Sequence, residues 1–445
     1  MAQREKNVAD SCCTWTFEER EPHGFCACVV VSQPFIKTLY QHALDRHRDS
    51  VQAYGFVRGE TPISYLERTY RSHIIEHLKE FLLNYSVIGH LCEEFYRHDA
   101  CVVGDPRLVS SKLEPNEGAE FVFSVAKTAL TPRSDWRKMI FRRPIRRNYK
   151  DIDRQVVDFI REERSTTSVD GVKKRVGISD WVLFGLNLCS PEGCSSLLDQ
   201  EAFFWIRIGR EDADREAQEL FLDKGVSDTF STKSAFLQQF LSKRVDTDYT
   251  FLITIVAIVP HVTFSFEGLK QHFFAGGESE KEDVAVHRLL IDVFSMRHDI
   301  SLRRETIEAL FKVLSRQFSS YIPREQIDQH GAYLLKTIQR SPDYPVYRLQ
   351  KNFKSVVSQL AEKQLRELLI IDHLARAEQV FVSGDDVVNY LGLLTRPRTR
   401  EFVYFHLPPT QFNGQEQPIP EGVVRQSVLR EKVLNTVLNY LAKRA

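Results

Sequence analysis

Long apolar runs are missing from this chain of 445 residues. The longest run, Phe251 to Pro260, is much shorter than the roughly 20 residues that a helix needs to cross a bilayer. The N-terminus, MAQREKNVAD, is polar and lacks the apolar core of a secretory signal. These absences predict a cytoplasmic protein that has no membrane partner.

Cysteine is scarce, with eight residues in the chain, which is too few for a disulfide-based scaffold of this length. The closely spaced pairs are Cys12 with Cys13, Cys26 with Cys28, and Cys189 with Cys194. None of these pairs has the spacing of a zinc site, and no paired histidines accompany them. We therefore expect reduced cysteines with structural roles, and neither a metal nor another cofactor.

An excess of one charge is also missing, because 60 lysines and arginines are matched by 60 aspartates and glutamates. The overall charge therefore does not indicate a nucleic acid or a membrane as partner. Histidines with helical spacing occur at positions 42 and 47 and at positions 73 and 77. No third ligand accompanies either pair, so we expect these histidines to be solvated on the surface.

Sequence motifs of polar catalysis are absent, including GxGxxG, the P-loop, HExxH and GxSxG. One reaction class needs none of them, because rotating the peptide bond before a proline breaks no covalent bond. The barrier, about 18–20 kcal/mol for peptide bonds in general, can be lowered by an apolar aromatic pocket that excludes water. A prolyl isomerase is therefore compatible with the missing motifs.

A glycine-bracketed loop, GFVRGETP at residues 55–62, is the most distinctive short segment that is present. Its notable residues are Gly55, Phe56, Arg58, Gly59 and Pro62. The two glycines permit left-handed backbone, and the proline suits the first turn of the helix expected over residues 63–96. A loop that presents an aromatic ring and a cation between two helices is suited to contact a partner, although an ordinary helix connection has the same pattern.

Periodicity divides the chain into four parts. Residues 1–131 form an α+β domain, 132–171 a linker with a helix, 172–262 a small α+β domain, and 263–445 an extended all-α module. The expected strands are 14–17, 25–31, 99–103, 107–113, 119–130, 181–189, 203–209 and 249–259, with a hairpin turn at 114–118. The expected helices are 34–47, 63–96, 151–164, 284–294, 303–318, 323–339, 346–377 and 423–443, with a short one from Asp385. The fold class is therefore α+β multidomain.

A basic segment at residues 133–150 combines cations with aromatic rings. The residues are Arg133, Trp136, Arg137, Lys138, Phe141, Arg142, Arg143, Arg146, Arg147, Tyr149 and Lys150. Grooves that bind single-stranded nucleic acids use this mixture of charge and stacking rings. A solvated linker has the same composition. The segment therefore leaves open an alternative function as an RNA-binding or scaffold protein.

The order of the parts, together with the loop, resembles trigger factor, the ribosome-associated bacterial chaperone. In that family the loop reads Gly-Phe-Arg-x-Gly-Lys-x-Pro. Gly55, Phe56, Gly59 and Pro62 match it, whereas Val57 and Glu60 replace the arginine and the lysine. Arg58 occupies the variable position. The resemblance runs from about Cys12 to the C-terminus.

The resemblance implies a set of partners and no cofactor. It places the loop on the large ribosomal subunit near the peptide exit, with contacts to ribosomal RNA. It makes the helical module a cradle for unfolded or nascent polypeptides, and it leaves open a homodimer away from the ribosome. For the tail at 413–443 we expect either docking on the helical frame or pairing with a partner.

The resemblance also implies that the second domain is an FKBP-like peptidyl-prolyl isomerase. Phe204 and Phe251 occupy positions of its aromatic pocket walls, and Leu186 stands where another aromatic residue is expected. The Ile-Pro-Gly-Phe segment that floors the pocket is missing, and the sequence at 212–215 near its place is Asp-Ala-Asp-Arg. A charged floor would oppose the binding of an apolar proline.

Overall fold

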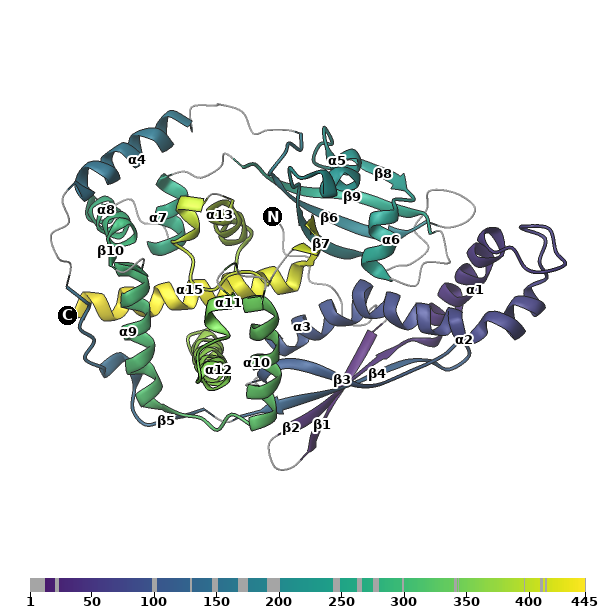
Figure 1. Cartoon of the computed structure of the whole chain (residues 1–445), viewed down its shortest axis with the longest axis horizontal. Helices are drawn as coiled ribbons and strands as arrows, with labels where there is room; N and C mark the ends of the chain where they lie inside the picture. The colour runs from purple at the N-terminus through teal and green to yellow at the C-terminus, as the bar shows by residue number, and fades with distance from the viewer. Residues whose placement is uncertain are drawn as a thin grey trace.

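The computed structural model describes residues 13–20, 24–97, 102–128, 130–145, 151–166, 175–189, 201–242, 249–261, 266–274, 280–297, 300–339, 342, 344–395, 397–408, 411–412 and 414–444. Figure 1 shows a helical module at one end of the molecule and a helical hairpin, made of α1 and α2, at the other. A small sheet domain lies above the hairpin, and the C-terminal helix α15 runs through the helical module toward it.

The first domain is an antiparallel sheet with helices inserted between its second and third strands. Its strands are β1 (Cys13–Arg20), β2 (Gly24–Val31), β3 (Val102–Glu114) and β4 (Gly118–Lys127), in the order β1-β2-β4-β3. The predicted hairpin turn at 114–118 is confirmed, and Gly118 has a φ of 109° there. A Cβ at this glycine would lie 2.6 Å from the carbonyl oxygen of Val31, so only glycine fits. The strands predicted at 99–103 and 107–113 form one strand over the part that is described.

The inserted helices are α1 (Gln33–Ser50), α2 (Ile63–Leu82) and α3 (Ile88–Arg97), with a π-turn at Leu83–Val87 between the last two. The helix expected over residues 63–96 is thus present without a break in the chain of helical residues, and one wide turn separates α2 from α3. The loop at 51–62 joins α1 to α2 and lies at the free end of their hairpin, away from the rest of the molecule (Figure 1).

The second domain is a five-stranded sheet with the order β15-β7-β6-β9-β8. Its elements are β6 (Trp181–Leu188), β7 (Ala202–Arg207), α5 (Arg215–Phe221), β8 (Thr229–Thr232), α6 (Ala235–Leu241), β9 (Phe251–Val259) and β15 (Ile419–Pro420). Nearly every residue of the central strand β6 is buried, because both faces of the sheet are covered. Phe184 and Leu186 pack toward the first domain, whereas Trp181 and Leu183 pack toward the helical module.

The edge strand β15 comes from the far end of the chain. Ile419 pairs with Trp205 of β7 in an antiparallel ladder. Residue 419 follows the second domain by more than 150 positions, so sequence periodicity gives no sign of this pairing. The tail docks on the frame, which is one of the two outcomes expected for it.

The helical module contains α4 (Ile152–Thr166), α7 (Phe266–Phe274), α8 (Glu280–Phe294), α9 (Leu302–Gln317), α10 (Arg324–Gln339), α11 (Tyr344–Tyr347), α12 (Phe353–Ala377), α13 (Gly384–Leu394), α14 (Pro397–Arg400) and α15 (Glu421–Arg444). Short ladders join β5 (Thr131–Pro132) to β12 (Phe318–Ser319), β10 (Met296–Arg297) to β11 (Ile300–Ser301), and β13 (Gln411–Phe412) to β14 (Gln415–Glu416). The β5–β12 ladder fastens the basic segment to the helical module.

One predicted helix is wrong at its start. The continuous helix expected from Val346 is divided into α11 and α12, and Leu349 lies between them with 79% of its surface exposed. The backbone N–H groups of Leu349 and Gln350 bond three residues back instead of four, and Asn352 has a non-helical conformation. These tight turns reorient the chain before α12 begins.

Three hydrophobic cores join parts that are distant in sequence. The first core is continuous between the sheet of the first domain and one face of the second domain. The second unites the 136–141 segment with α9, α10, α12 and α15, and the third unites α4, α7, α8 and α13 with the other face of the second domain. Packing therefore crosses the segment boundaries that periodicity predicts.

Candidate functional site

The loop at 51–62 has the backbone that its glycines predict. Gly55 and Gly59 have φ values of 86° and 85°. The N–H of Phe56 donates to the carbonyl of Ala53 (3.1 Å), and the N–H of Glu60 donates to that of Val57 (3.0 Å). The loop is thus two successive turns, each of which contains a left-handed glycine.

The tip of this loop presents apolar side chains to solvent. Tyr54 is 98% exposed, Val57 is 66% exposed, and Phe56 is 37% exposed with its ring 5.1 Å from that of Tyr65. Arg58 is exposed as well, but its Nε donates to the carbonyl of Asp49 (2.9 Å), so part of this side chain holds the loop against α1. Sequence comparison with the family loop missed Tyr54, because it precedes the matching segment.

The three residues expected to line an isomerase pocket lie together in the interior of the second domain. Phe204 is 2% exposed, and Phe251 and Leu186 are fully buried. The ring of Phe204 lies 5.8 Å from that of Phe184 and 5.5 Å from that of Phe240. A peptide has no access to these side chains while this core stays closed, and their role in catalysis stays a prediction.

The acidic residues near the expected pocket floor have another partner. Asp214 is fully buried, and its Oδ1 accepts a hydrogen bond from the backbone N–H of Glu416 (2.7 Å). Burial raises the pKa of the Asp214 carboxyl above its ordinary value. This carboxylate therefore fixes the C-terminal segment to the second domain rather than flooring a pocket.

Histidines hold the second domain against the hairpin. The ring of Tyr249 lies between two imidazoles, with centroids 5.5 Å from His42 and 5.5 Å from His77. Its hydroxyl is 2.9 Å from Nε2 of His77, and Oγ of Ser242 is 3.0 Å from Nδ1 of the same ring. The prediction of solvated surface histidines is therefore wrong for positions 42, 47 and 77, which are 2%, 1% and 4% exposed.

Burial has an electrostatic consequence for His42. Loss of hydration, and then the positive charge of Arg46, lower the pKa of its imidazole to about 4, although a contact with the backbone of Cys189 acts in the opposite direction. His42 is therefore neutral at physiological pH, and it stacks on Tyr249 as an uncharged ring.

Side chains of the first domain also donate hydrogen bonds to backbone carbonyls of the second domain at the same interface. The hydroxyl of Tyr85 donates to the carbonyl of Leu186 (3.0 Å), and the side-chain amide of Asn84 donates to that of Leu241 (2.9 Å). Both donors come from the π-turn, whose wide geometry displaces these side chains from the regular helical positions. The strand β6, which carries Leu186, is thus hydrogen-bonded directly to the first domain.

The basic segment does not offer stacking rings in its described part. Trp136 and Phe141 are 7% and 3% exposed, so neither ring is available for the base stacking that the alternative function of this segment would use. Arg137 pairs with Glu378, which also accepts a hydrogen bond from the indole of Trp136 (3.1 Å). Arg146, Arg147, Tyr149 and Lys150 lie outside the described residues.

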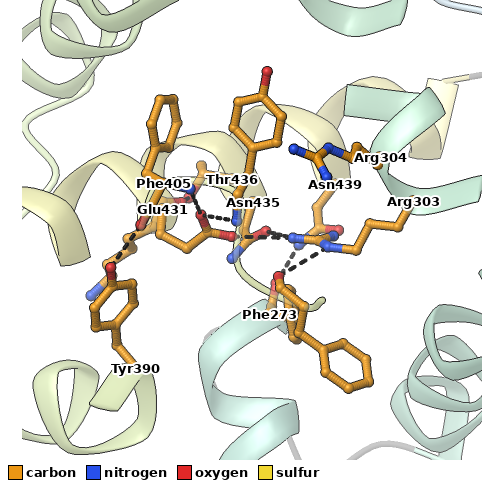
Figure 2. A network of polar contacts seen from close by, with 12 residues as sticks. Phe273, Arg303, Arg304, Tyr390, Phe405, Glu431, Asn435, Thr436 and Asn439 are labelled. Carbon is orange, nitrogen blue, oxygen red and sulfur yellow. Dashed lines mark hydrogen bonds and ion pairs between the residues drawn. The ribbon is translucent and has the colours of Figure 1, made fainter. Parts of the chain in front are cut away.

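A buried polar network joins α9 and the segment at 402–405 to the C-terminal helix α15 (Figure 2). Nη2 of Arg303 on α9 contacts Glu431 (3.2 Å) and Asn435 (2.9 Å) on α15, and its Nε donates to the carbonyl of Phe402 (3.1 Å). Glu431 also accepts hydrogen bonds from the backbone N–H groups of Tyr404 and Phe405 (3.0 and 3.1 Å). Sequence reasoning missed this network, because isolated charges in helices carry no pattern.

Exposed apolar side chains gather on the connection between α10 and α12. Val346 is 65% exposed, Tyr347 42%, Leu349 79% and Val356 50%. Val346, Tyr347 and Leu349 lie at the point where the predicted helix is broken, and Val356 lies in the first turn of α12. Apolar surface concentrated in this way is typical of an interaction site.

Three further findings concern cysteines, metals and membranes. The cysteines in the described ranges are free thiols, as expected. Over the same ranges no group of three histidine, cysteine or acidic side chains is arranged to hold a metal ion. No helix in the described part has both the length and the hydropathy needed to span a bilayer.

Comparison with known proteins gives a distant structural similarity. No protein-family profile and no curated protein sequence matches it. Among solved structures, it is similar to a protein-folding chaperone. That protein is trigger factor, described as "Promiscuous Substrate Recognition in Folding and Assembly Activities of the Trigger Factor Chaperone", with 15% identity, a TM-score of 0.38, and coverage of 96% of this chain and 100% of that one. The similarity is distant, so we draw the function from the residues of this chain.

Proposed function

We propose that this protein is a cytoplasmic chaperone that docks on the ribosome through the loop at 51–62 and holds unfolded chain segments on its helical module. The observation that carries the proposal is the concentration of exposed apolar side chains on two separate parts of the molecule. One is the loop tip with Tyr54, Phe56 and Val57, and the other is the α10–α12 connection.

Docking through the loop follows from its chemistry. Aromatic and arginine side chains dominate the binding energy of many interfaces, and Tyr54, Phe56 and Arg58 combine both kinds at an unobstructed tip. The partner is the large ribosomal subunit near the peptide exit. Because Arg58 is the single cation among residues 55–62, we expect few phosphate contacts to ribosomal RNA and a shallow dependence on salt.

Holding of unfolded segments follows from the second surface. An unfolded chain loses conformational entropy when it is bound, so affinity for each apolar contact is weak and contacts must be spread over a surface. Val346, Tyr347 and Leu349 provide such contacts without closing a pocket. Prolyl isomerisation stays outside the proposal, because the pocket residues are closed off from solvent.

Replacing both Tyr54 and Phe56 with alanine is expected to weaken ribosome binding by about tenfold or more, because anchor residues of an interface contribute at least 2 kcal/mol. Co-sedimentation of the purified protein with ribosomes measures this change. Val109→Ala is the matched control, since Val109 is 55% exposed on β3, away from the loop. Equal sedimentation of the double variant and the wild-type protein would contradict docking through this loop.

Replacing both Val346 and Leu349 with serine is expected to weaken client binding by about tenfold or more, because burying one aliphatic side chain contributes roughly 1.5–3 kcal/mol. The measurement is suppression of aggregation when a denatured protein is diluted into buffer, as a function of chaperone concentration. Val226→Ser, at a site 49% exposed in the second domain, serves as control. Ribosome binding should remain unchanged, so the two surfaces are tested independently, and undiminished suppression would exclude the α10–α12 connection as the client surface.

A further inference from the structure

A second feature of the helical module has no part in the proposed function. A small hollow that is open to solvent lies between the start of α9 and the segment at 400–406. Its lining residues are Arg303, Arg304, Ile307, Arg400, Glu401, Val403, Tyr404 and His406. Three guanidinium groups and an imidazole therefore share one hollow with a single carboxylate.

The cations of this hollow differ in how they are compensated. Arg303 is buried and paired with Glu431 at 3.2 Å. Arg304 and Arg400 are exposed, and their guanidinium groups have no carboxylate partner in the part of the chain that the structure describes. The hollow thus carries two positive charges that form no ion pair within the described residues, beside the single negative charge of Glu401.

The walls of the hollow are held rigidly. The buried Thr399 donates to the carbonyl of Leu393 (2.6 Å), and the turn that follows it is closed by bonds from Phe402 to Thr399 (3.0 Å) and from Val403 to Arg400 (3.1 Å). Arg303 binds the carbonyl of Phe402 from the other side. Arg400 and Glu401 therefore protrude from a turn whose position is fixed before any ligand binds.

Side chains, not the helix end, supply the charge. The first turn of α9 is already capped, because the N–H of Arg304 donates to Oγ of Ser301 (3.2 Å). His406 responds to the same charges. Its pKa is lowered to about 4, by loss of hydration around the ring and then by the charges of Arg400 and Arg304, although the residue keeps part of its surface in solvent.

We propose that this hollow is a binding site for the hydrogen phosphate dianion, held by the guanidinium groups of Arg304 and Arg400. Guanidinium groups bind phosphate oxygens in pairs of parallel hydrogen bonds, and two of them match the two charges of the ligand. Hydrogen phosphate also has one O–H, which donates to the Glu401 carboxylate. A sulfate ion has no proton to donate, so Glu401 repels it without a compensating hydrogen bond.

Isothermal titration with sodium phosphate at pH 7.5, at ionic strength held constant with chloride, tests the site. We expect saturable binding by the wild-type protein, and a loss of about tenfold or more in affinity on Arg400→Gln or Arg304→Gln, because each removes a charge-assisted contact. Arg215→Gln is the control, since Arg215 is an exposed helix arginine of the second domain. Absence of saturable binding, or equal affinity of all four proteins, would overturn the proposal.

Two other anions test the role of Glu401 and the source of the phosphate group. Sulfate and O-phosphoserine, whose phosphate group has no P–OH proton left at pH 7.5, should bind several-fold more weakly than phosphate. Glu401→Gln should remove this preference, because the amide donates hydrogen bonds to either anion. If sulfate binds the wild-type protein as tightly as phosphate does, the site is not specific for hydrogen phosphate.

The ring of His406 gives an independent spectroscopic readout. A bound dianion beside this ring changes its electrostatic surroundings, because it offsets the charges of Arg304 and Arg400. The Cε1–H resonance of His406, assigned with His406→Gln, should therefore shift on titration with phosphate at pH 7.5, where the dianion is the main species. A resonance that keeps its chemical shift at saturating phosphate would contradict binding beside this ring.

Discussion

Replacing Arg303 with methionine is expected to lower the free energy of unfolding by about 3–5 kcal/mol. Glu431 is fully buried and would remain as a carboxylate without its cation. The carbonyl of Phe402 and Oδ1 of Asn435 would also lose their donor. Removing one member of a buried pair is costly because the other members cannot regain water.

The size of this effect follows from the number of elements that meet at Arg303. Its guanidinium group contacts α15 through Glu431 and the 402–405 segment through Phe402, and its Cζ lies 4.5 Å from the ring centroid of Phe273 on α7 (Figure 2). Asn439, one turn further along α15, donates to the carbonyl of Phe273. The network therefore fixes α7, α9 and α15 together, and its loss loosens the whole helical module.

Urea unfolding followed by tryptophan fluorescence measures the cost. Arg215→Met is the matched control, because the Arg215–Glu219 pair is exposed and its loss should cost less than about 1 kcal/mol. The double variant Arg303→Met/Glu431→Gln should cost less than the sum of its two single variants, since both singles break one interaction. Costs that add without coupling would show that the two side chains do not stabilise each other.

Much of the fold is readable from periodicity. Strands β6 and β9 are apolar on both faces, and such runs stand out in the sequence because a sheet covered on both sides needs no polar residue. The glycine-bracketed loop was predictable because Gly55 and Gly59 adopt backbone that other residues avoid. These features depend on local sequence, and the structure confirms them.

The misplaced histidines show where local sequence is insufficient. On α1, Ile36, Tyr40 and Ala43 face the first sheet, as an amphipathic helix predicts. His42 lies on another face of the helix, which is buried only because the second domain covers it with Tyr249. Docking between domains depends on two surfaces. The apolar period of α1 indicates which face packs on its own sheet, but it does not indicate that the second domain covers another face.

The polar network and the edge strand were unpredictable for a related reason. Arg303 begins an ordinary helix, and Glu431 lies in a helix that contains several other charges. Nothing in either segment shows that these two side chains meet across 128 positions. Ile419 and Pro420 likewise form a strand only because β7 offers them an unpaired edge.

Acid is expected to weaken this protein through His42 by about 2–3 kcal/mol between pH 6.5 and 4.5. The pKa of this imidazole is about 4 in the folded protein and 6.5 when unfolded. Well above pH 6.5 this imidazole is neutral in both states, and it then causes no change of stability with pH. As the pH falls toward 4, the unfolded chain binds a proton that the folded chain excludes, so stability decreases.

Other groups titrate in the same range and must be separated from His42. Burial lowers the pKa of His272 to about 3, which also destabilises the fold in acid. Burial raises the pKa of Glu367 to about 7. This group therefore lowers the stability of the fold as the pH rises above 4.5, and the lost stability returns in acid. The net curve of the wild-type protein is therefore a sum, whereas the difference from a variant at position 42 isolates one group.

His42→Phe provides that difference, because phenylalanine keeps a ring against Tyr249 and binds no proton. Urea unfolding should show similar stabilities for both proteins at pH 7.5, and a variant more stable than the wild-type protein by about 2–3 kcal/mol at pH 4.5. Hydrogen exchange should locate the acid-induced opening at α1 and at the start of β9, because His42 of α1 stacks on Tyr249, which lies just before β9. If the stabilities of the wild-type protein and the variant fall in parallel between pH 7.5 and pH 4.5, the destabilising proton binds to a group other than His42. A variant that resists acid would show that protonation of His42 is what weakens the contact between the second domain and the hairpin in the wild-type protein.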